Sequence, residues 1–198
     1  PTGKQCDEFD NIRVTCIDNG MPVVCLRAID FGLNGSETPD QLNANENLKL
    51  QLESIRLKAG LAMGLGDVSG KAIPKMCLVS RPRHGGTINT HTFIPKQCHK
   101  AIGVLGAVSV GTAALLQNSV IRSLASFSCN QKTDKNLKQM IIEHPSGSIT
   151  VELEMSQKGV RPMVKQAGLL RTTRMLCRGE VYIPKSVWDG KIDSTPPK

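Results

Sequence analysis

Residues 101–116 read AIGVLGAVSVGTAALL, a run without a single charge in which Ser109 and Thr112 are the only polar side chains. A helix over this run would be ~24 Å long and apolar on every side, so it would have to be surrounded by protein. The glycines in the run lower helix propensity and suit a place where another backbone comes very close. The run therefore predicts a central helix wrapped by a sheet. A pair of buried strands is the alternative that periodicity leaves open.

Short segments rich in β-branched residues stand on both sides of this run and predict the strands of the sheet. They cover residues 12–18, 23–27, 76–80, 87–94, 139–143, 148–154, 168–177 and 180–183. Thr38, Pro39 and Gln41 predict a helix start, and apolar residues every three or four positions predict an amphipathic helix over residues 48–62. Without a repeat or a linker, residues 1–198 are predicted to form one α+β domain, a mostly antiparallel sheet around a central apolar helix.

Composition narrows the classes of function. Of the 198 residues, 39% are apolar and 21% charged, which is a globular composition. The net charge of +8 is spread from Lys4 to Lys198 with acids between, which indicates general attraction to anions rather than a nucleic-acid partner. Aromatic residues make up 3%, too few for a base-stacking surface. With no run of about 18 apolar residues and no signal peptide, we expect a cytoplasmic protein without a membrane partner.

Cysteines and common motifs indicate neither a metal centre nor a nucleotide site. The seven cysteines are scattered without a CxxC pair, which is typical of reduced thiols. Walker, GxGxxG, GxSxG and HExxH motifs are absent from the sequence.

Cys98 and His99 stand immediately before the apolar run. If the helix begins there, its unpaired amides and its dipole favour a carboxylate ligand and lower the pKa of a thiol. Lys96, His99 and Lys100 add positive charge. The functional interpretation is a reactive thiol beside a carboxylate pocket, and the alternative is a buried cysteine next to a surface histidine.

Asn19, Gly20 and Met21 follow a predicted strand and allow two interpretations. An Asn-Gly pair is typical of a hairpin turn, whereas a glycine at a strand end also lets a ligand approach the backbone. Arg171 and Arg174 also allow two interpretations. One of them could bind a carboxylate bidentately, or both could lie on a solvated edge.

Several segments along nearly the whole chain match one family pattern. They are Pro1-Thr2-Gly3, TCIDNGMPVV at residues 15–24, AMGLGDVS at 62–69, Pro74-Lys75-Met76, FIPKQCHKAIGVLGAVSVGTAA at 93–114, EHPSG at 143–147 and GLLRTTR at 168–174. On these segments the chain resembles the C-terminal half of the 2-methylaconitate cis-trans isomerase family. The wider group includes methylitaconate isomerases and oxalomesaconate tautomerases.

The resemblance implies a fold like that of diaminopimelate epimerases. Two similar halves each wrap a sheet around a central helix, and the active site lies between them. Cys98 stands where the catalytic cysteine of the C-terminal half would be, but His99 and Lys100 replace the small residues that follow it in the epimerases. The resemblance thus implies Cys98 as catalytic. With the residues argued above, Asn19, Gly20, Met21, Lys96, His99 and Lys100 are the candidate substrate-binding residues.

The implied reaction is a proton or double-bond shift in an unsaturated tricarboxylate such as 2-methylaconitate, in propionate catabolism through the methylcitrate cycle. Such a shift needs fixed donors and cations, so neither a metal nor an organic cofactor is implied. The implied partners are a small polycarboxylate and the N-terminal half of the same enzyme, and a homodimer is left open.

In the family, the main base, a lysine, and another cysteine belong to the N-terminal half. We therefore expect no isomerisation by residues 1–198 alone. The alternative function is a non-catalytic carboxylate-binding or protein-interaction domain that retains the fold.

Overall fold

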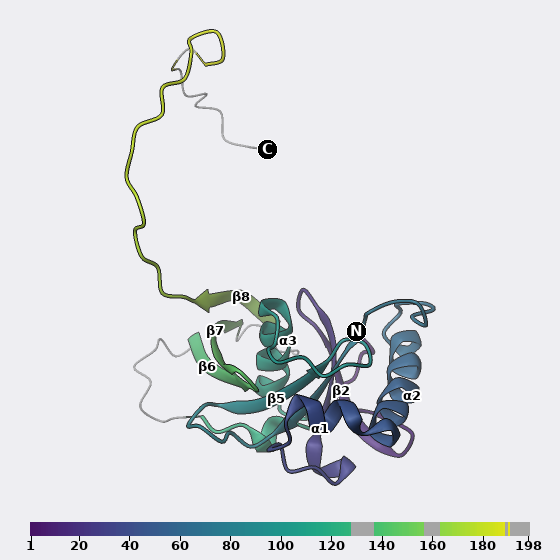
Figure 1. The fold of residues 1–198 in the computed structure, drawn as a ribbon. Coiled ribbons are helices and arrows are strands. Elements are labelled where there is room, and N and C mark those ends of the chain that lie inside the picture. Colours follow the sequence, from purple (N-terminus) through teal and green to yellow (C-terminus); the bar gives the residue numbers. More distant parts are fainter. Residues whose placement is uncertain (128–136, 157–162, 189, 191–198) are drawn as a thin grey trace.

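The computed structural model describes residues 1–127, 137–156, 163–188 and 190. Within them, eight strands form one sheet in which each strand lies beside its neighbour in the chain (Figure 1). The strands are β1 (Asp7–Phe9), β2 (Ile12–Asp18), β3 (Pro22–Arg27), β4 (Lys75–Ser80), β5 (Ile88–Phe93), β6 (Leu137–His144), β7 (Gly147–Ser156) and β8 (Met163–Leu170). The pairs β3–β4 and β5–β6 are parallel, and the other neighbours are antiparallel.

The helices of the described residues lie on both sides of this sheet. They are α1 (Pro39–Ala44), α2 (Glu46–Ala62), α3 (Val104–Leu115) and the short 3-10 helices η1 (Ala28–Phe31) and η2 (Arg122–Leu124). The sheet curves around α3, while α1 and α2 cover its other face (Figure 1). The expected α+β fold, a mostly antiparallel sheet around a central apolar helix, is confirmed. None of these helices combines the length and the apolar character needed to cross a membrane.

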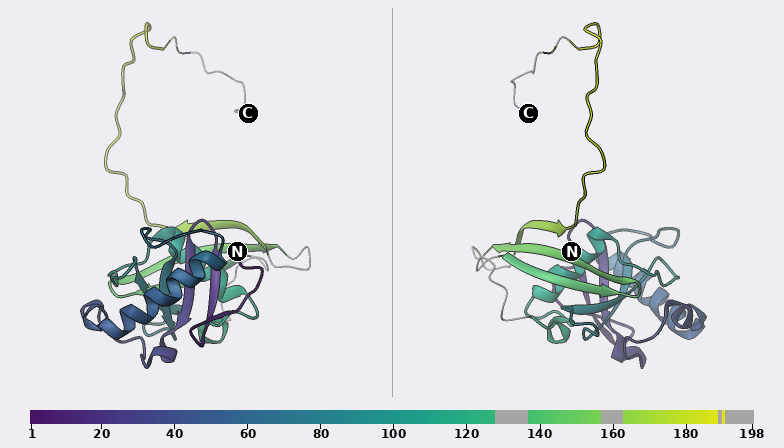
Figure 2. Two further views of the ribbon diagram at one scale, coloured as in Figure 1. Left: turned by 90° about the vertical axis from the view of Figure 1, so that its right-hand side faces the viewer. Right: turned by 60° about the vertical axis from the view of Figure 1, so that its left-hand side comes forward.

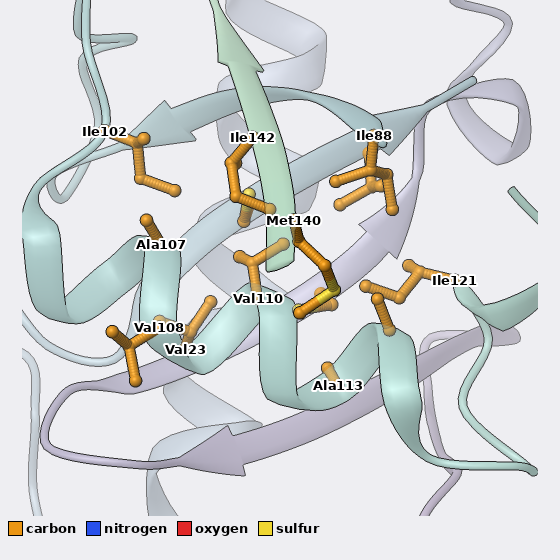
Figure 3. Close-up of a cluster of buried hydrophobic side chains, with 14 of the residues drawn as sticks. Val23, Ile88, Ile102, Ala107, Val108, Val110, Ala113, Ile121, Met140 and Ile142 are labelled. Atoms are coloured by element: carbon orange, nitrogen blue, oxygen red, sulfur yellow. The ribbon is translucent and has the colours of Figure 1, made fainter. Parts of the chain in front are cut away.

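The helix α3 is buried because its small and β-branched residues pack against the surrounding strands. Ala107, Val110 and Ala113 are fully buried and share one cluster with Met140 of β6 (Figure 3). At Gly111 a Cβ atom would lie 2.8 Å from Cε of Met140, closer than carbon atoms normally pack. This glycine therefore leaves room for side chains of β6 and β7 to pack against the helix, whereas the sequence had predicted the close approach of another backbone.

The strands β3 and β4 are covered on both faces. In β3, Val23 and Cys25 belong to the cluster around α3, whereas Val24 and Leu26 belong to the cluster under α1 and α2. This alternation follows from the two-residue period of a strand. We call the second cluster the outer cluster, and Leu52 of α2 is one of its buried members.

The local signals for α1 and α2 are confirmed. At the start of α1, the Gln41 amide donates to Oγ1 of Thr38 at 3.2 Å, and the Thr38 amide donates to Oε1 of Gln41 at 2.8 Å, which is a capping box. Asn45 caps α2 by accepting from the Leu48 amide at 3.0 Å.

Three expectations about the elements are wrong. The helix α3 begins at Val104 with Gly103 as its N-cap, and not at Cys98. The strand expected over residues 168–177 ends with β8 at Leu170, and residues 180–183 form no strand. Residues 171–188 instead extend away from the body of the domain (Figure 2), where no neighbouring strand of the described residues can pair with them.

Candidate active site

A cavity of about 300 Å³ opens where α3 begins. The first turn of α3 forms one wall, and the starts of β3 and β4 and the end of β5 form the others. The lining residues are Met21, Val23, Lys75, Cys77, Thr92, Ile94 and residues 102–106. The cavity is thus mostly apolar, with few polar groups, as is typical of small-molecule sites.

The first turn of α3 has no side-chain cap. Gly103 makes no capping hydrogen bond from a side chain, and the first turn holds no acidic residue. The leading amides of a helix lack intrahelical partners, and the helix dipole adds partial positive charge at this end. An anion is therefore favoured here. The helix N-terminus that the sequence predicted beside Cys98 lies at Gly103 instead.

Lys75 is the only charged residue among those that line the cavity. It is the first residue of β4 and is half-buried, and this burial lowers the pKa of its ammonium group. None of the ion pairs within the described residues involves Lys75. In the sequence, Lys75 stands out only as part of the family pattern at residues 74–76. A single lysine at the start of a buried strand is the signal that could have singled it out.

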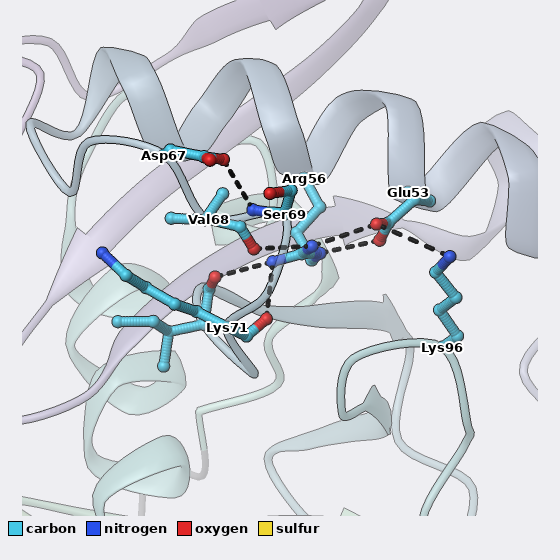
Figure 4. A network of polar contacts seen from close by, with 8 residues as sticks. Glu53, Arg56, Asp67, Val68, Ser69, Lys71 and Lys96 are labelled. Carbon is cyan, nitrogen blue, oxygen red and sulfur yellow. Dashed lines mark hydrogen bonds and ion pairs between the residues drawn. The ribbon is translucent and has the colours of Figure 1, made fainter.

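The loop that leads into Lys75 is held by the fully buried Arg56 of α2 (Figure 4). Its guanidinium donates to the carbonyl oxygens of Val68, Lys71 and Ile73 at 3.0, 3.1 and 2.7 Å. The same group pairs with both carboxylate oxygens of Glu53, at 2.7 and 3.0 Å, which lowers the pKa of Glu53.

The turn between β2 and β3 is attached to α3 by the two polar residues of that helix. The Asn19 amide donates to Oγ of Ser109 at 3.2 Å, and Ser109 donates to the Met21 carbonyl at 2.7 Å. The Asn19 side chain donates to Oγ1 of Thr112 at 3.0 Å. A Cβ atom on Gly20, whose φ is 88°, would lie 3.3 Å from a methyl group of Leu105. The turn therefore fixes one edge of the cavity.

Cys98 lies away from this cavity. Its side chain is 5% exposed and packs in the outer cluster with Phe93, on the face of the sheet opposite α3. Burial raises the pKa of the Cys98 thiol to about 12, so the expected lowering of the pKa is wrong. The physical reason is that the helix, whose dipole would lower the pKa, begins only at Val104. The alternative of a buried cysteine next to an exposed histidine describes the geometry, and the catalytic role of Cys98 stays a prediction.

The basic residues around Cys98 do not line the cavity either. Lys96 is exposed and its Nζ lies 3.8 Å from a carboxylate oxygen of Glu53 (Figure 4). The side chains of His99 and Lys100 are exposed, and the Lys100 carbonyl accepts from the amide and the hydroxyl of Ser146 at 3.0 and 2.7 Å. Of the candidate substrate-binding residues, only Met21 lines the cavity. Gly20 lies beside Leu105 in the first turn of α3, and Asn19 is bonded farther along the helix, to Ser109 and Thr112. The roles of all six candidates stay predictions.

In the described part of the chain, no three His, Cys, Asp or Glu side chains are grouped so that they could hold a metal ion. The polar groups that line the cavity are the leading backbone amides of α3, the ammonium of Lys75, the thiol of Cys77 and the hydroxyl of Thr92.

Fold and cavity together define an α+β protein in which a curved, mostly antiparallel sheet encloses one apolar helix, with a small, mostly apolar cavity where that helix begins. The chain belongs to the PrpF protein family, whose model matches residues 1–184.

Comparison with known proteins agrees with this assignment. The chain is 50% identical to a 4-oxalomesaconate tautomerase of Pseudomonas putida over 190 residues, covering 96% of this chain and 50% of that protein. It is 26% identical to a 2-methyl-aconitate isomerase of Shewanella oneidensis over 207 residues, covering 93% and 50%. The crystal structure of a methylitaconate-delta-isomerase has the same fold, with a TM-score of 0.69 and 22% identity over 86% of this chain and 49% of that one. The chain therefore spans about half the length of the relatives it matches.

Proposed function

We propose that the chain contributes one wall of an isomerase site that moves a proton, and with it a double bond, in an unsaturated tricarboxylate. The observation that carries the proposal is the cavity at the start of α3, where Lys75 and the uncapped amides of the first turn meet among apolar side chains. The isomerase and tautomerase names of the relatives support the class of reaction.

The cavity suits one carboxylate of such a substrate. The carboxylate would accept hydrogen bonds from the leading amides of α3, with the Lys75 ammonium as its counter-charge. Met21, Ile94 and Ile102 would contact the carbon skeleton beyond it. The mixture of one charged group, free amides and apolar walls therefore matches an acid with an unsaturated carbon chain.

The same groups would assist the proton shift. Removing a proton from a carbon next to a double bond leaves negative charge, which spreads through the double bond onto a carboxylate. Fixed donors that already point at this carboxylate stabilise the charge as it develops. Their effect is larger where the site is shielded from water, as around the half-buried Lys75. The proton itself would pass to a base supplied by the rest of the enzyme.

A site of this kind needs a second wall. The cavity is open to solvent, and water would screen the charges that stabilise the transition state. We propose that the part of the family's proteins which this chain does not span closes the site, in a cytoplasmic enzyme. Residues 1–198 alone would then bind a carboxylate weakly and turn over no substrate.

The greater similarity to the P. putida relative favours 4-oxalomesaconate over 2-methylaconitate as the substrate. A role in propionate catabolism would follow only from turnover of 2-methylaconitate.

The test compares the 198-residue chain with the same chain co-expressed with the half of the P. putida enzyme that it does not match. The ultraviolet absorbance of 4-oxalomesaconate and of 2-methylaconitate reports turnover. Turnover is expected only in the second preparation. A complex that forms but converts neither acid would support the non-catalytic alternative, and robust turnover by the isolated chain would contradict the divided site.

A further inference from the structure

The turn of the β6–β7 hairpin lies beside the loop that leads from β5 to α3. It belongs to the segment EHPSG at residues 143–147, none of which lines the cavity at the start of α3. Ser146 stands in this turn, and both its amide and its hydroxyl donate to the Lys100 carbonyl, at 3.0 and 2.7 Å. Lys100 comes shortly before Gly103, the N-cap of α3, so the turn holds the chain just ahead of the cavity.

The Ser146 hydroxyl is itself fixed by a neighbour. Because its proton is donated to the Lys100 carbonyl, its oxygen is left to accept from Nδ1 of His144, which lies 3.2 Å away. Burial lowers the pKa of the His144 ring, so the ring is uncharged at neutral pH. The side chain of Ser146 therefore has a defined orientation toward the loop.

The turn is also anchored to the sheet. The Thr90 hydroxyl of β5 donates to the Glu143 carbonyl at 2.7 Å, and the Glu143 carboxylate accepts from three amides of residues 83–86. Only Pro145 and Ser146 stand between the paired ends of β6 and β7, so the turn is tight. Ser146 is therefore a fixed point from which the neighbouring loop can be held.

The loop from β5 to α3 needs such a fixed point, because residues 94–103 carry part of the cavity wall. The His99 amide donates to the Thr92 carbonyl at 2.9 Å, which holds the loop close to the end of β5. Between Lys100 and the N-cap of α3, no other segment of the described residues donates or accepts a hydrogen bond. The contact with Ser146 is thus the last polar restraint before the helix begins.

We infer that Ser146 is a positioning residue of the proposed isomerase site, which acts through the Lys100 carbonyl on the place where α3 begins. The inference rests on the proposed function, in which the leading amides of α3 bind a carboxylate whose negative charge grows during the reaction. Donors stabilise such a charge best when they are fixed in advance. A displacement of about 1 Å can slow a reaction about a hundredfold. Ser146 itself lies outside the cavity and would touch neither the substrate nor the reacting atoms.

The experiment compares two substitutions of Ser146. Ser146→Ala deletes the hydroxyl and keeps the amide, whereas Ser146→Thr keeps both donors. Ser148→Ala, at another exposed serine of the same hairpin, is the matched control. All are assayed after co-expression with the half of the P. putida 4-oxalomesaconate tautomerase that this chain does not match.

Ser146→Ala should lower kcat about tenfold and change KM by less than about threefold, because loosened donors lose most of their effect in the transition state. Ser146→Thr should restore kcat to within about twofold of the wild type, and Ser148→Ala should not change it. A loss of folded protein would not produce this split between kcat and KM, nor would it be reversed by the hydroxyl of threonine.

Hydrogen exchange in the 198-residue chain gives a readout that is independent of the reaction. The Ala107 amide donates to the Gly103 carbonyl at 2.9 Å and is the first hydrogen-bonded amide of α3. Its exchange, measured by nuclear magnetic resonance, should be about threefold or more faster in Ser146→Ala than in Ser148→Ala.

Equal exchange of the Ala107 amide in the two alanine variants would overturn the inference. Faster exchange with an unchanged kcat would overturn it too, as would a loss of kcat that Ser146→Thr does not restore. If the assembled wild type converts neither acid, the proposed function fails. The exchange of Ala107 then decides by itself whether Ser146 fixes the start of α3.

Discussion

Asn43 of α1 holds the backbone of Cys98 on both sides. Its Oδ1 accepts from the Cys98 amide at 2.7 Å, and its Nδ2 donates to the Cys98 carbonyl at 3.3 Å. The pairing fixes Cys98 against the layer formed by α1 and α2, with its side chain in the outer cluster. The cavity at the start of α3 lies across the sheet from this cluster, so the two candidate centres of chemistry are separated by the sheet itself.

Cys98→Ala is expected to change stability more than activity. Burial keeps the thiol protonated at neutral pH, and deleting a buried sulfur lowers the free energy of unfolding by about 1–2 kcal/mol. Because the thiol lies in the outer cluster and does not line the cavity, turnover of the assembled enzyme should stay within about threefold of the wild type. Urea unfolding and the ultraviolet assay measure the two effects. A hundredfold loss of kcat at unchanged stability would instead establish the catalytic role that the family resemblance implies, and such a factor is typical of a lost reacting group.

Lys75→Met should lower kcat/KM of the assembled enzyme about a hundredfold, because it removes the cation that stabilises the developing carboxylate charge. Methionine keeps much of the volume and the apolar contacts of the lysine stem. Lys138→Met is the matched control, because Lys138 is an exposed lysine on β6 and does not line the cavity. Similar kcat/KM values for the two variants would contradict a role of Lys75 and of the cavity in the reaction.

Protonation of Glu143 should lower the free energy of unfolding at acidic pH. Burial by itself would raise the pKa of this carboxyl, but the amides of Arg83, Gly86 and His84 donate to it at 2.7, 2.7 and 2.8 Å and hold its pKa below the usual value. A lowered pKa means that the ionised group stabilises the fold above its usual pKa of about 4.3, and that this contribution is lost as the pH falls through the lowered value.

Glu143→Gln is therefore expected to lower the free energy of unfolding by about 2 kcal/mol at neutral pH, with a difference from the wild type that narrows towards about pH 3. Urea unfolding across this pH range measures the difference. Glu8→Gln, at an exposed site on β1, serves as the control and should follow the wild type. A difference that does not change with pH would contradict the assignment to ionisation of Glu143.

Arg56→Met should destabilise the protein by about 3–5 kcal/mol, because it leaves Glu53 without its buried partner and three loop carbonyls without their donor. Arg56→Lys should recover little, since a lysine cannot reach these acceptors in the planar geometry of a guanidinium. Lys165→Met, which breaks the exposed pair with Glu154, should change stability by less than about 1 kcal/mol. Guanidinium chloride unfolding of the three variants tests this order, and equal effects of Arg56→Met and Lys165→Met would contradict it.

Several elements could be predicted from the sequence because their causes are local. The uncharged run around Ser109 predicted the central helix, since a helix without a polar face must be enclosed. Thr38 and Gln41 predicted the start of α1, since the capping box is formed by neighbouring residues. The strand bounds of β2 were predicted to the residue, because β-branched residues and the turn after Asp18 mark them in the chain.

The location of the site depended on contacts between distant residues. The side of the sheet that Cys98 faces is set by its bridge to Phe93 and by Asn43, which no local pattern encodes. Lys75 reaches the start of α3 because β4 pairs in parallel with β3, a register that only the assembled sheet establishes.

Local propensity thus specified the helices and most strands of this chain, since capping, periodicity and β-branching act over a few residues. Tertiary structure specified which residues share the cavity, because strand pairing and helix packing bring Met21, Lys75 and Gly103 together from separate segments. It also left residues 171–177 and 180–183 outside the sheet: their composition favours strands, but a strand forms only where a neighbouring strand accepts its hydrogen bonds.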